Sequence, residues 1–141
     1  MYQRDYILRM IEMIGVLVSG ILGRIKKGDF KEASEAIENA YQEVLKEDAA
    51  FFNNIPLARL TDKLIGEHNY TNGHLEILSE LFYTQAELSY ARGFRNESLK
   101  YYQKSLKLLE FITMESKSFS LEKQARISSL KKRITELDIE D

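Results

Sequence analysis

The stretch LEILSELFYTQAELSYARGFRNESLKYYQKSLKLLEFI, residues 75–112, decides the fold predicted for this chain. Gly93 divides it, and on each side apolar residues recur every three or four positions, the spacing that forms one stripe along a helix. Glycine readily enters the left-handed backbone that ends many helices. The short connection predicts two antiparallel helices. The two stripes consist of Leu75, Leu78, Leu81, Phe82 and Ala86, then Leu99, Tyr102, Leu106, Leu109 and Ile112.

Small and large side chains around the turn follow a defined order. The small Ala86 lies seven positions before Gly93, and the small Ser98 lies five positions after it. The large Tyr102 follows four positions after Ser98, and the small Ser105 follows three positions after Tyr102. Small residues let paired helices approach closely, and the large one fills the gap. In this order the stretch resembles a tetratricopeptide repeat, with serine in place of the usual alanine at 98 and 105.

A second copy of this order lies upstream, at Gly28. Ala33, Ile37 and Ala40 follow that glycine at the same offsets, although Ile21 occupies the small position before it. The two glycines are 65 residues apart, close to two repeats of about 34 residues. The resemblance implies an all-α fold: a short tetratricopeptide-like array of antiparallel helical hairpins with a C-terminal capping helix.

The chain divides into four predicted parts within one domain, residues 1–141. The middle part is irregular, because residues 48–54 break the periodicity and residues 67–73 form a polar loop. Ser120 is a suitable N-cap for the last helix. The parts are a hairpin at 2–46, the irregular segment 47–74, a hairpin at 75–114 and the capping helix 120–137.

Composition favours a cytoplasmic helical protein. Of 141 residues, 44% are hydrophobic and one is proline, which suits an all-helical chain with a real core. The absence of cysteine excludes disulfides and thiol chemistry and fits a reducing compartment. The net charge of −2 gives no indication of nucleic-acid binding, and the basic run Lys131–Arg133 is followed by four acidic residues.

The first helix, Tyr2–Lys27, carries the most apolar sequence in the chain. Its nearly unbroken apolar run, Met13–Leu22, has ten residues, short of the roughly 20 that span a bilayer. Asp5 and Glu12 do not suit a signal peptide. We therefore expect a buried helix and no membrane contact. The beginning of the chain also resembles a family of small bacterial helical proteins, a resemblance that implies a prokaryotic cytosolic protein and no activity.

No catalytic constellation is present. The chain lacks a nucleophile motif and a phosphate-binding glycine loop. His68 and His74, with Glu67, match no spacing of metal ligands and are expected in a solvated loop. The sequence therefore predicts no enzyme activity, no cofactor and no metal site.

A concave groove is the candidate binding surface. In the family that the chain resembles, the first helix of each hairpin lines this groove. By position the resemblance implicates Val18, Leu22, Glu80, Tyr83, Glu87 and Tyr90. Tyrosines combine large contact area with a polar tip. The alternative is that Tyr83 and Tyr90 pack beneath the middle segment or the last helix. Glu80 and Thr84 stand where some relatives carry a Lys and Asn clamp for a terminal carboxylate, which argues against that binding mode.

Two functional hypotheses follow from these features. The first is a non-enzymatic adaptor that binds a protein or peptide in the groove. The second is a structural homo-oligomer, in its simplest form a homodimer, assembled through the apolar N-terminal helix. An enzyme or small-ligand site between the helices has no set of residues behind it.

Overall fold

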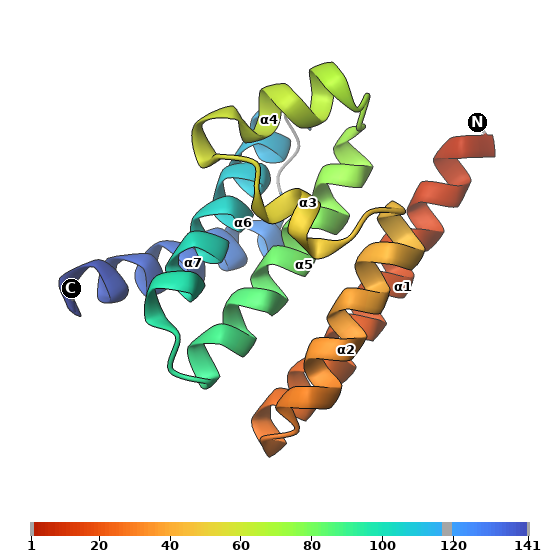
Figure 1. Cartoon of the computed structure of the whole chain (residues 1–141). Coiled ribbons are helices and arrows are strands. Elements are labelled where there is room, and N and C mark those ends of the chain that lie inside the picture. Colours follow the sequence, from red (N-terminus) through yellow and green to blue (C-terminus); the bar gives the residue numbers. More distant parts are fainter. Residues whose placement is uncertain (1, 117–119, 141) are drawn as a thin grey trace.

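The computed structural model describes residues 2–116 and 120–140, and these residues contain helices and no strand. The predicted all-α class is confirmed. Residues 1, 117–119 and 141 of the predicted domain lie outside the described part. The main helices, drawn in Figure 1, are α1 (Tyr2–Lys27), α2 (Phe30–Ala40), α5 (Asn72–Ala91), α6 (Arg95–Ser116) and α7 (Leu121–Glu140).

Two glycine turns reverse the chain. Gly28, between α1 and α2, and Gly93, between α5 and α6, both adopt φ of +84°. This left-handed conformation costs side-chain-bearing residues energy. After the second turn the Phe94 N–H donates to the Ser89 carbonyl over 2.8 Å, which closes the end of α5. Helices α1 and α2 lie within residues 2–46, and α5 and α6 together span residues 72–116; α2 continues as a π-helical turn over Tyr41–Leu45.

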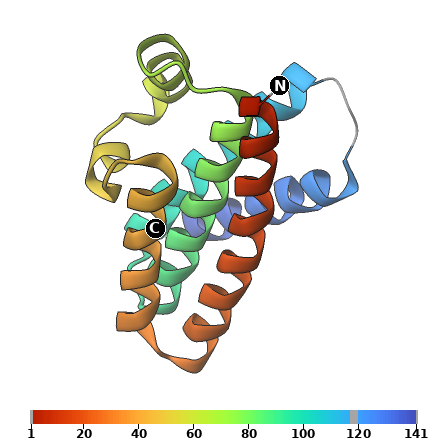
Figure 2. The ribbon, with the colours of Figure 1, turned by 90° about the vertical axis from the view of Figure 1, so that its right-hand side faces the viewer.

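Helix α5 lies at the centre of the packing. It pairs most extensively with α6 and also contacts α1 and α2, while α7 packs on α6. Figure 2 shows α1 along the near side of the molecule, with α5 behind it. Ile7 near the start of α1 lies against Gly73 at the start of α5. Lys26, near the end of α1, and Glu87, near the end of α5, line the same groove. The two helices therefore run in the same direction.

Two buried serines, Ser79 and Ser105, form hydrogen bonds across the contact between α5 and α6. The Ser79 hydroxyl donates to the Ser105 carbonyl over 2.9 Å, and the Ser105 hydroxyl donates to the Ser79 carbonyl over the same distance. Ser105 is fully buried and Ser79 nearly so. Each hydroxyl is small enough for close approach and satisfies its own hydrogen-bonding capacity across the interface. The serine departures from the repeat pattern thus have a structural reason at position 105.

The middle segment is more helical than the sequence predicted. Residues 48–54 contain a short helix, α3 (Ala49–Asn53), because the Asp48 carboxylate accepts from the Phe51 N–H over 2.9 Å. Five residues are too few to show a periodic pattern. Further turns follow after Pro56: η2 (Leu57–Arg59), α4 (Leu60–Asp62) and the π-helical turn η3 (Lys63–Glu67).

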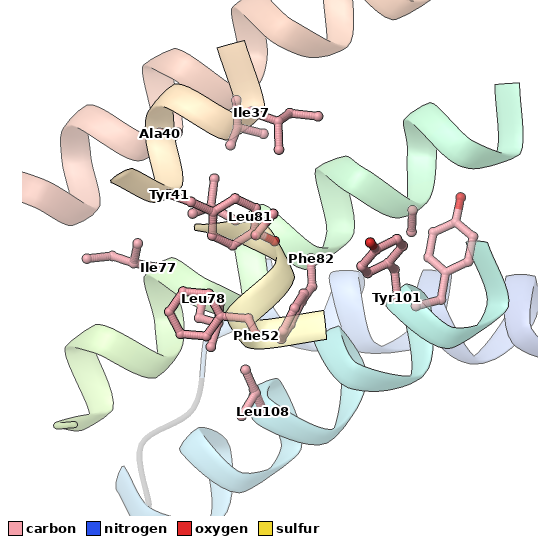
Figure 3. Packing of buried hydrophobic residues seen from close by; sticks show 14 of the residues in the cluster. Ile37, Ala40, Tyr41, Phe52, Ile77, Leu78, Leu81, Phe82, Tyr101 and Leu108 are labelled. Atoms are coloured by element: carbon pink, nitrogen blue, oxygen red, sulfur yellow. The ribbon is translucent and has the colours of Figure 1, made fainter. Parts of the chain in front are cut away.

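Phe52 and Lys104 attach this segment to the core. Phe52 is fully buried and stacks on Tyr41 with ring centroids 5.6 Å apart (Figure 3). The buried Lys104 ammonium of α6 donates to the Asn53 carbonyl at the C-terminal end of α3 over 2.9 Å. Burial lowers the pKa of Lys104, and the nearby Lys100 lowers it further. The exposed carbonyls of a helix end are a suitable partner for a buried cation.

The start of α5 corrects the predicted loop at 67–73. Thr71 is its N-cap, and His74 accepts the Thr71 N–H at Nδ1 over 3.1 Å. The Thr71 hydroxyl in turn accepts the His74 N–H over 3.4 Å, which completes a capping box. His74 therefore belongs to a helix and not to a solvated loop. Glu or Gln normally fills its position in this motif, so the histidine concealed the helix start.

We expect Ala33→Leu and Ala40→Leu each to lower the free energy of unfolding by about 1–3 kcal/mol, because both sites are almost fully buried between helices. Urea unfolding followed by circular dichroism measures this. Ala125→Leu on the exposed side of α7 is the matched control and should change stability by less than about 0.5 kcal/mol. Equal stability of all three variants would contradict the packing of α2.

We also expect His74 to make stability depend on pH. Burial lowers its folded pKa from the ordinary value of 6.5, so the folded state favours neutral imidazole. The contribution of His74 to the free energy of unfolding is fully present above the pKa that His74 has in the unfolded state. It is lost as the pH falls through the lower pKa that His74 has in the folded state. In His74→Gln, urea unfolding should show a smaller decline between about pH 7.5 and about pH 5. The same decline in both proteins would assign the effect to other groups.

Candidate protein-binding groove

A groove of about 680 Å³ runs between α1, α5 and the start of α7. Its α1 wall is mainly apolar, and its α5 wall is mainly acidic. The small residues of α1 leave open space, and a Cβ added at Gly15 or Gly23 would meet no neighbouring atom within 4 Å. The side chains most relevant to binding are Ile11, Val18 and Leu22 on α1, Glu76, Glu80, Tyr83 and Glu87 on α5, and Glu122 and Arg126 on α7.

Most of the residues implicated by the sequence lie together here. Val18, Leu22, Glu80, Tyr83 and Glu87 all line the groove. Val18 forms its floor, with 4% of its surface exposed, whereas Leu22 and Tyr83 are partly exposed. Tyr90 is not among the lining residues. The geometry of the lining residues suits a binding surface, and their role in binding stays a prediction.

Helix α7 covers the tyrosines of α5. The guanidinium of Arg126 lies 3.8 Å from the ring centroid of Tyr83, and that of Arg133 lies 3.9 Å from the ring centroid of Tyr90. Both pairs repeat at a spacing of seven residues, so the two helices run in the same direction. The alternative that these tyrosines pack beneath the last helix therefore holds for Tyr90 and, in part, for Tyr83.

Ion pairs reinforce the same contact. Arg126 donates to the Glu80 carboxylate over 3.1 Å, and Lys123 lies 3.2 Å from the Glu76 carboxylate. All four side chains are partly exposed, so each pair contributes at most about 1 kcal/mol. These ion pairs mainly position the first turns of α7, which become the third wall of the groove.

Carboxylates outnumber cations around the groove. Glu76, Glu80, Glu87 and Glu122 line it, against the cations Lys26 and Arg126. Including Lys123, which pairs with Glu76 from just outside, the groove still keeps one negative charge more than positive. The acidic side chains stand on α5 and α7, opposite the apolar α1 wall. The groove thus offers an apolar surface beside an acidic edge.

Tyr83 remains protonated at neutral pH. Burial and the nearby Glu87 carboxylate raise the pKa of Tyr83 to about 12, although Arg126 opposes the change. Burial and Glu87 also raise the pKa of Tyr102, which lies behind it on α6. The Tyr83 hydroxyl therefore keeps its proton and is a hydrogen-bond donor, with the Glu87 carboxylate as its acceptor. None of these shifts brings a proton donor or acceptor into the range useful for catalysis near neutral pH.

The other candidate groups serve the fold. The rings of His68 and His74 both lie near Tyr70, with centroids 6.2 and 4.8 Å from the Tyr70 ring centroid. Within residues 2–116 and 120–140 no group of three or more His, Asp and Glu could hold a metal ion. In the basic run at the end of the chain, Lys131 lies 3.5 Å from Glu110, and Arg133 stacks on Tyr90.

Helix α1 is apolar enough to resemble a membrane span. Over Asp5–Lys27 it meets the length and composition of a bilayer-crossing helix, and 17% of its most apolar window is buried. The expectation of no membrane contact rested on the shorter run Met13–Leu22, which contains no charged residue. The longer segment Asp5–Lys27 also includes charged residues on both sides of that run. Core helices of soluble proteins, which are mostly buried, and signal sequences near an N-terminus meet the same criterion. The expectation of a buried helix is wrong for most of α1: Ile14, Val18 and Ile21 are buried in the core, whereas most side chains described between Asp5 and Lys27 are exposed.

Comparisons of the chain with protein-family models, curated proteins and solved structures find no match. Several groove residues also escaped sequence reasoning. Ser19 and Gly23 lie on the same side of α1 as Leu22, so helical spacing could have identified them. Glu122 and Arg126 could not be found this way, because their place in the groove depends on how α7 folds back.

We expect Arg126→Gln to lower the free energy of unfolding by about 1 kcal/mol, because it removes the stacking on Tyr83 and the charge opposite Glu80. Arg126→Lys keeps the charge and should lose less. Urea unfolding at low ionic strength measures both. If the two variants lose the same amount, stacking and not charge is the important contact; if neither loses stability, α7 is not held by this residue.

Proposed function

We propose that this protein is a non-enzymatic adaptor that binds a protein or peptide in the groove between α1, α5 and α7. The observation that carries the proposal is the groove itself, in which an apolar wall faces an acidic one over about 680 Å³. Binding sites in proteins are concave, largely apolar and supplied with a few polar groups for orientation. The perturbed pKa values here belong to tyrosines and support no catalytic role.

The repeat architecture is part of this proposal. Helices α1, α5 and α7 run in the same direction, and α2 and α6 pair with the first two of them. We propose that α1, α5 and α7 are the successive first helices of a short tetratricopeptide-like array, with α7 as its cap. Such arrays bind partners on the surface formed by these helices. The absence of cysteine fits the cytoplasmic location that we include in the proposal.

The charge of the groove indicates the chemistry of its partner. Leu22 and Ile11 on one wall suit apolar side chains, and the excess carboxylates on the other wall suit lysine or arginine. We therefore expect the partner to present a segment in which apolar residues alternate with basic ones. Its affinity should fall when salt is raised from about 0.05 M to about 0.5 M, since exposed charges are screened over shorter distances at high salt.

Gly15→Arg tests the groove with little risk to the fold. Gly15 lines the groove, its Cβ would meet open space, and arginine is a better helix former than glycine. The new side chain fills the groove and repels a basic partner. Gly66→Arg is the matched control, because Gly66 also has open space around it and lies in η3, outside the groove.

The measurement is quantitative mass spectrometry of the proteins that the tagged wild type and both variants capture from the cells that produce the chain. We expect at least one protein that Gly66→Arg retains and Gly15→Arg loses by about tenfold or more, a change of roughly 1.4 kcal/mol in binding. Capture that is equal for both variants, or recovery of nothing but the chain itself, would show that the groove is not the adaptor surface.

A further inference from the structure

The outward side of α1 has no partner among the described residues, and it is apolar. Val16 is 78% exposed and Met13 is 60% exposed, and the exposed Ser19 and Gly20 that follow carry no charge. Figure 2 shows this helix along the near side of the molecule, with no other helix in front of it. The outer side of a helix in a soluble protein normally carries charged residues, so an uncovered apolar side indicates an interaction surface.

Charges of opposite sign mark the two ends of this surface. Glu12 lies before the apolar section, and Lys26 and Lys27 lie after it, all three exposed. Steps of four, three, four and four residues lead from Glu12 through Val16, Ser19 and Gly23 to Lys27, so these positions share one face of the helix. Between Met13 and Gly23 the sequence contains no charged residue. Before the apolar section the exposed Asp5, Arg9 and Glu12 leave one net negative charge, and after it Lys26 and Lys27 are positive. The face is therefore apolar in the middle, with net charges of opposite sign at its two ends.

We propose that this face of α1 pairs antiparallel with α1 of a second copy of the chain, about a two-fold axis near Ser19 and Gly20. In that arrangement Glu12 of each copy lies beside Lys26 and Lys27 of the other, so the two-fold axis makes the favourable contact twice. A parallel pair would instead place Glu12 beside Glu12 and the lysines beside lysines. The charge pattern therefore selects a second copy and its direction.

The residues near the axis suit close packing of two helices. Ser19, Gly20 and Gly23 have small or no side chains, and a Cβ at either glycine would meet open space. Helices packed through such residues approach more closely than the usual 8–10 Å between axes. Val16 of each copy then lies over the small residues of the other, which removes the most exposed apolar side chain of the helix from water.

This pairing is independent of the proposed adaptor function, although the two surfaces adjoin. Ser19, Gly23 and Lys26 also line the groove, so α1 of the second copy would lie along its rim. Gly15, which tests the groove, faces the inner wall. Loss of dimers without loss of the captured partner, or the reverse, separates the two proposals.

The absence of cysteine allows a direct test of the contact. Ser19→Cys places one thiol on each side of the proposed axis, and a disulfide forms only when the two Cα atoms lie within about 7 Å. We expect Ser19→Cys to give a covalent dimer under mild oxidation. Ser129→Cys, on the exposed side of α7, is the control and should stay monomeric on a denaturing gel.

Sedimentation of the wild type and of variants that carry no added cysteine measures the dissociation constant of the dimer. The wild type should be a dimer, and Val16→Glu should raise its dissociation constant by more than about tenfold. Glu12→Lys should also weaken the dimer. The triple variant Glu12→Lys, Lys26→Glu, Lys27→Glu should restore it, because residue 12 of each copy again lies beside charges of opposite sign in the other copy. Thermal unfolding of each variant checks that it is folded.

Three outcomes would overturn the proposal. One is a wild type that stays monomeric at every concentration. Another is a dimer that Val16→Glu leaves intact and that Ser19→Cys fails to cross-link, which would place the interface elsewhere. The third is a monomeric wild type that binds vesicles of phosphatidylethanolamine and phosphatidylglycerol and loses this binding in Val16→Glu, which would make a lipid surface the occupant.

Discussion

The close contact between α5 and α6 is the interaction on which the rest of this structure depends. It brings Ser79 and Ser105 together in a buried, reciprocal pair of hydrogen bonds. A bulkier side chain at either position would separate the helices, and an apolar one would leave its partner hydroxyl with fewer acceptors. Every other part of the fold packs on this pair: α1 and α2 on α5, the middle segment on α6 through Phe52 and Lys104, and α7 on α6.

The two sides of α5 explain why the groove is acidic. Its inner side must bury Leu78, Leu81 and Phe82, so its polar residues collect on the side toward α1 and α7. Two of the carboxylates there, Glu76 and Glu80, fix the start of α7 by ion pairs. Glu87 instead lies near the hydroxyls of Tyr83 and Tyr102. The charges that position the cap are thus also the charges that a bound segment would meet.

The long periodic segments were predictable, whereas α3 and the start of α5 were not. The apolar spacing in α1, α5 and α6 identified helices whose limits agree with the structure within a few residues. Helix α3 escaped because five residues capped by Asp48 carry no periodic signal. The start of α5 escaped because His74 fills a capping position usually held by Glu or Gln. Of the six residues expected in the binding groove, five line the groove of the structure and Tyr90 does not, and their role in binding stays a prediction.

By itself the sequence determined that the chain is helical, where its long helices lie and which side of each is apolar, because these properties depend on spacing within one segment. Only the tertiary structure decided that α7 folds over Tyr83 and Tyr90, that Arg126 becomes a wall of the groove and that Val16 stays uncovered. These features depend on contacts between residues more than 40 positions apart or on their absence. No local pattern encodes such contacts, since they follow from how all the helices share one core.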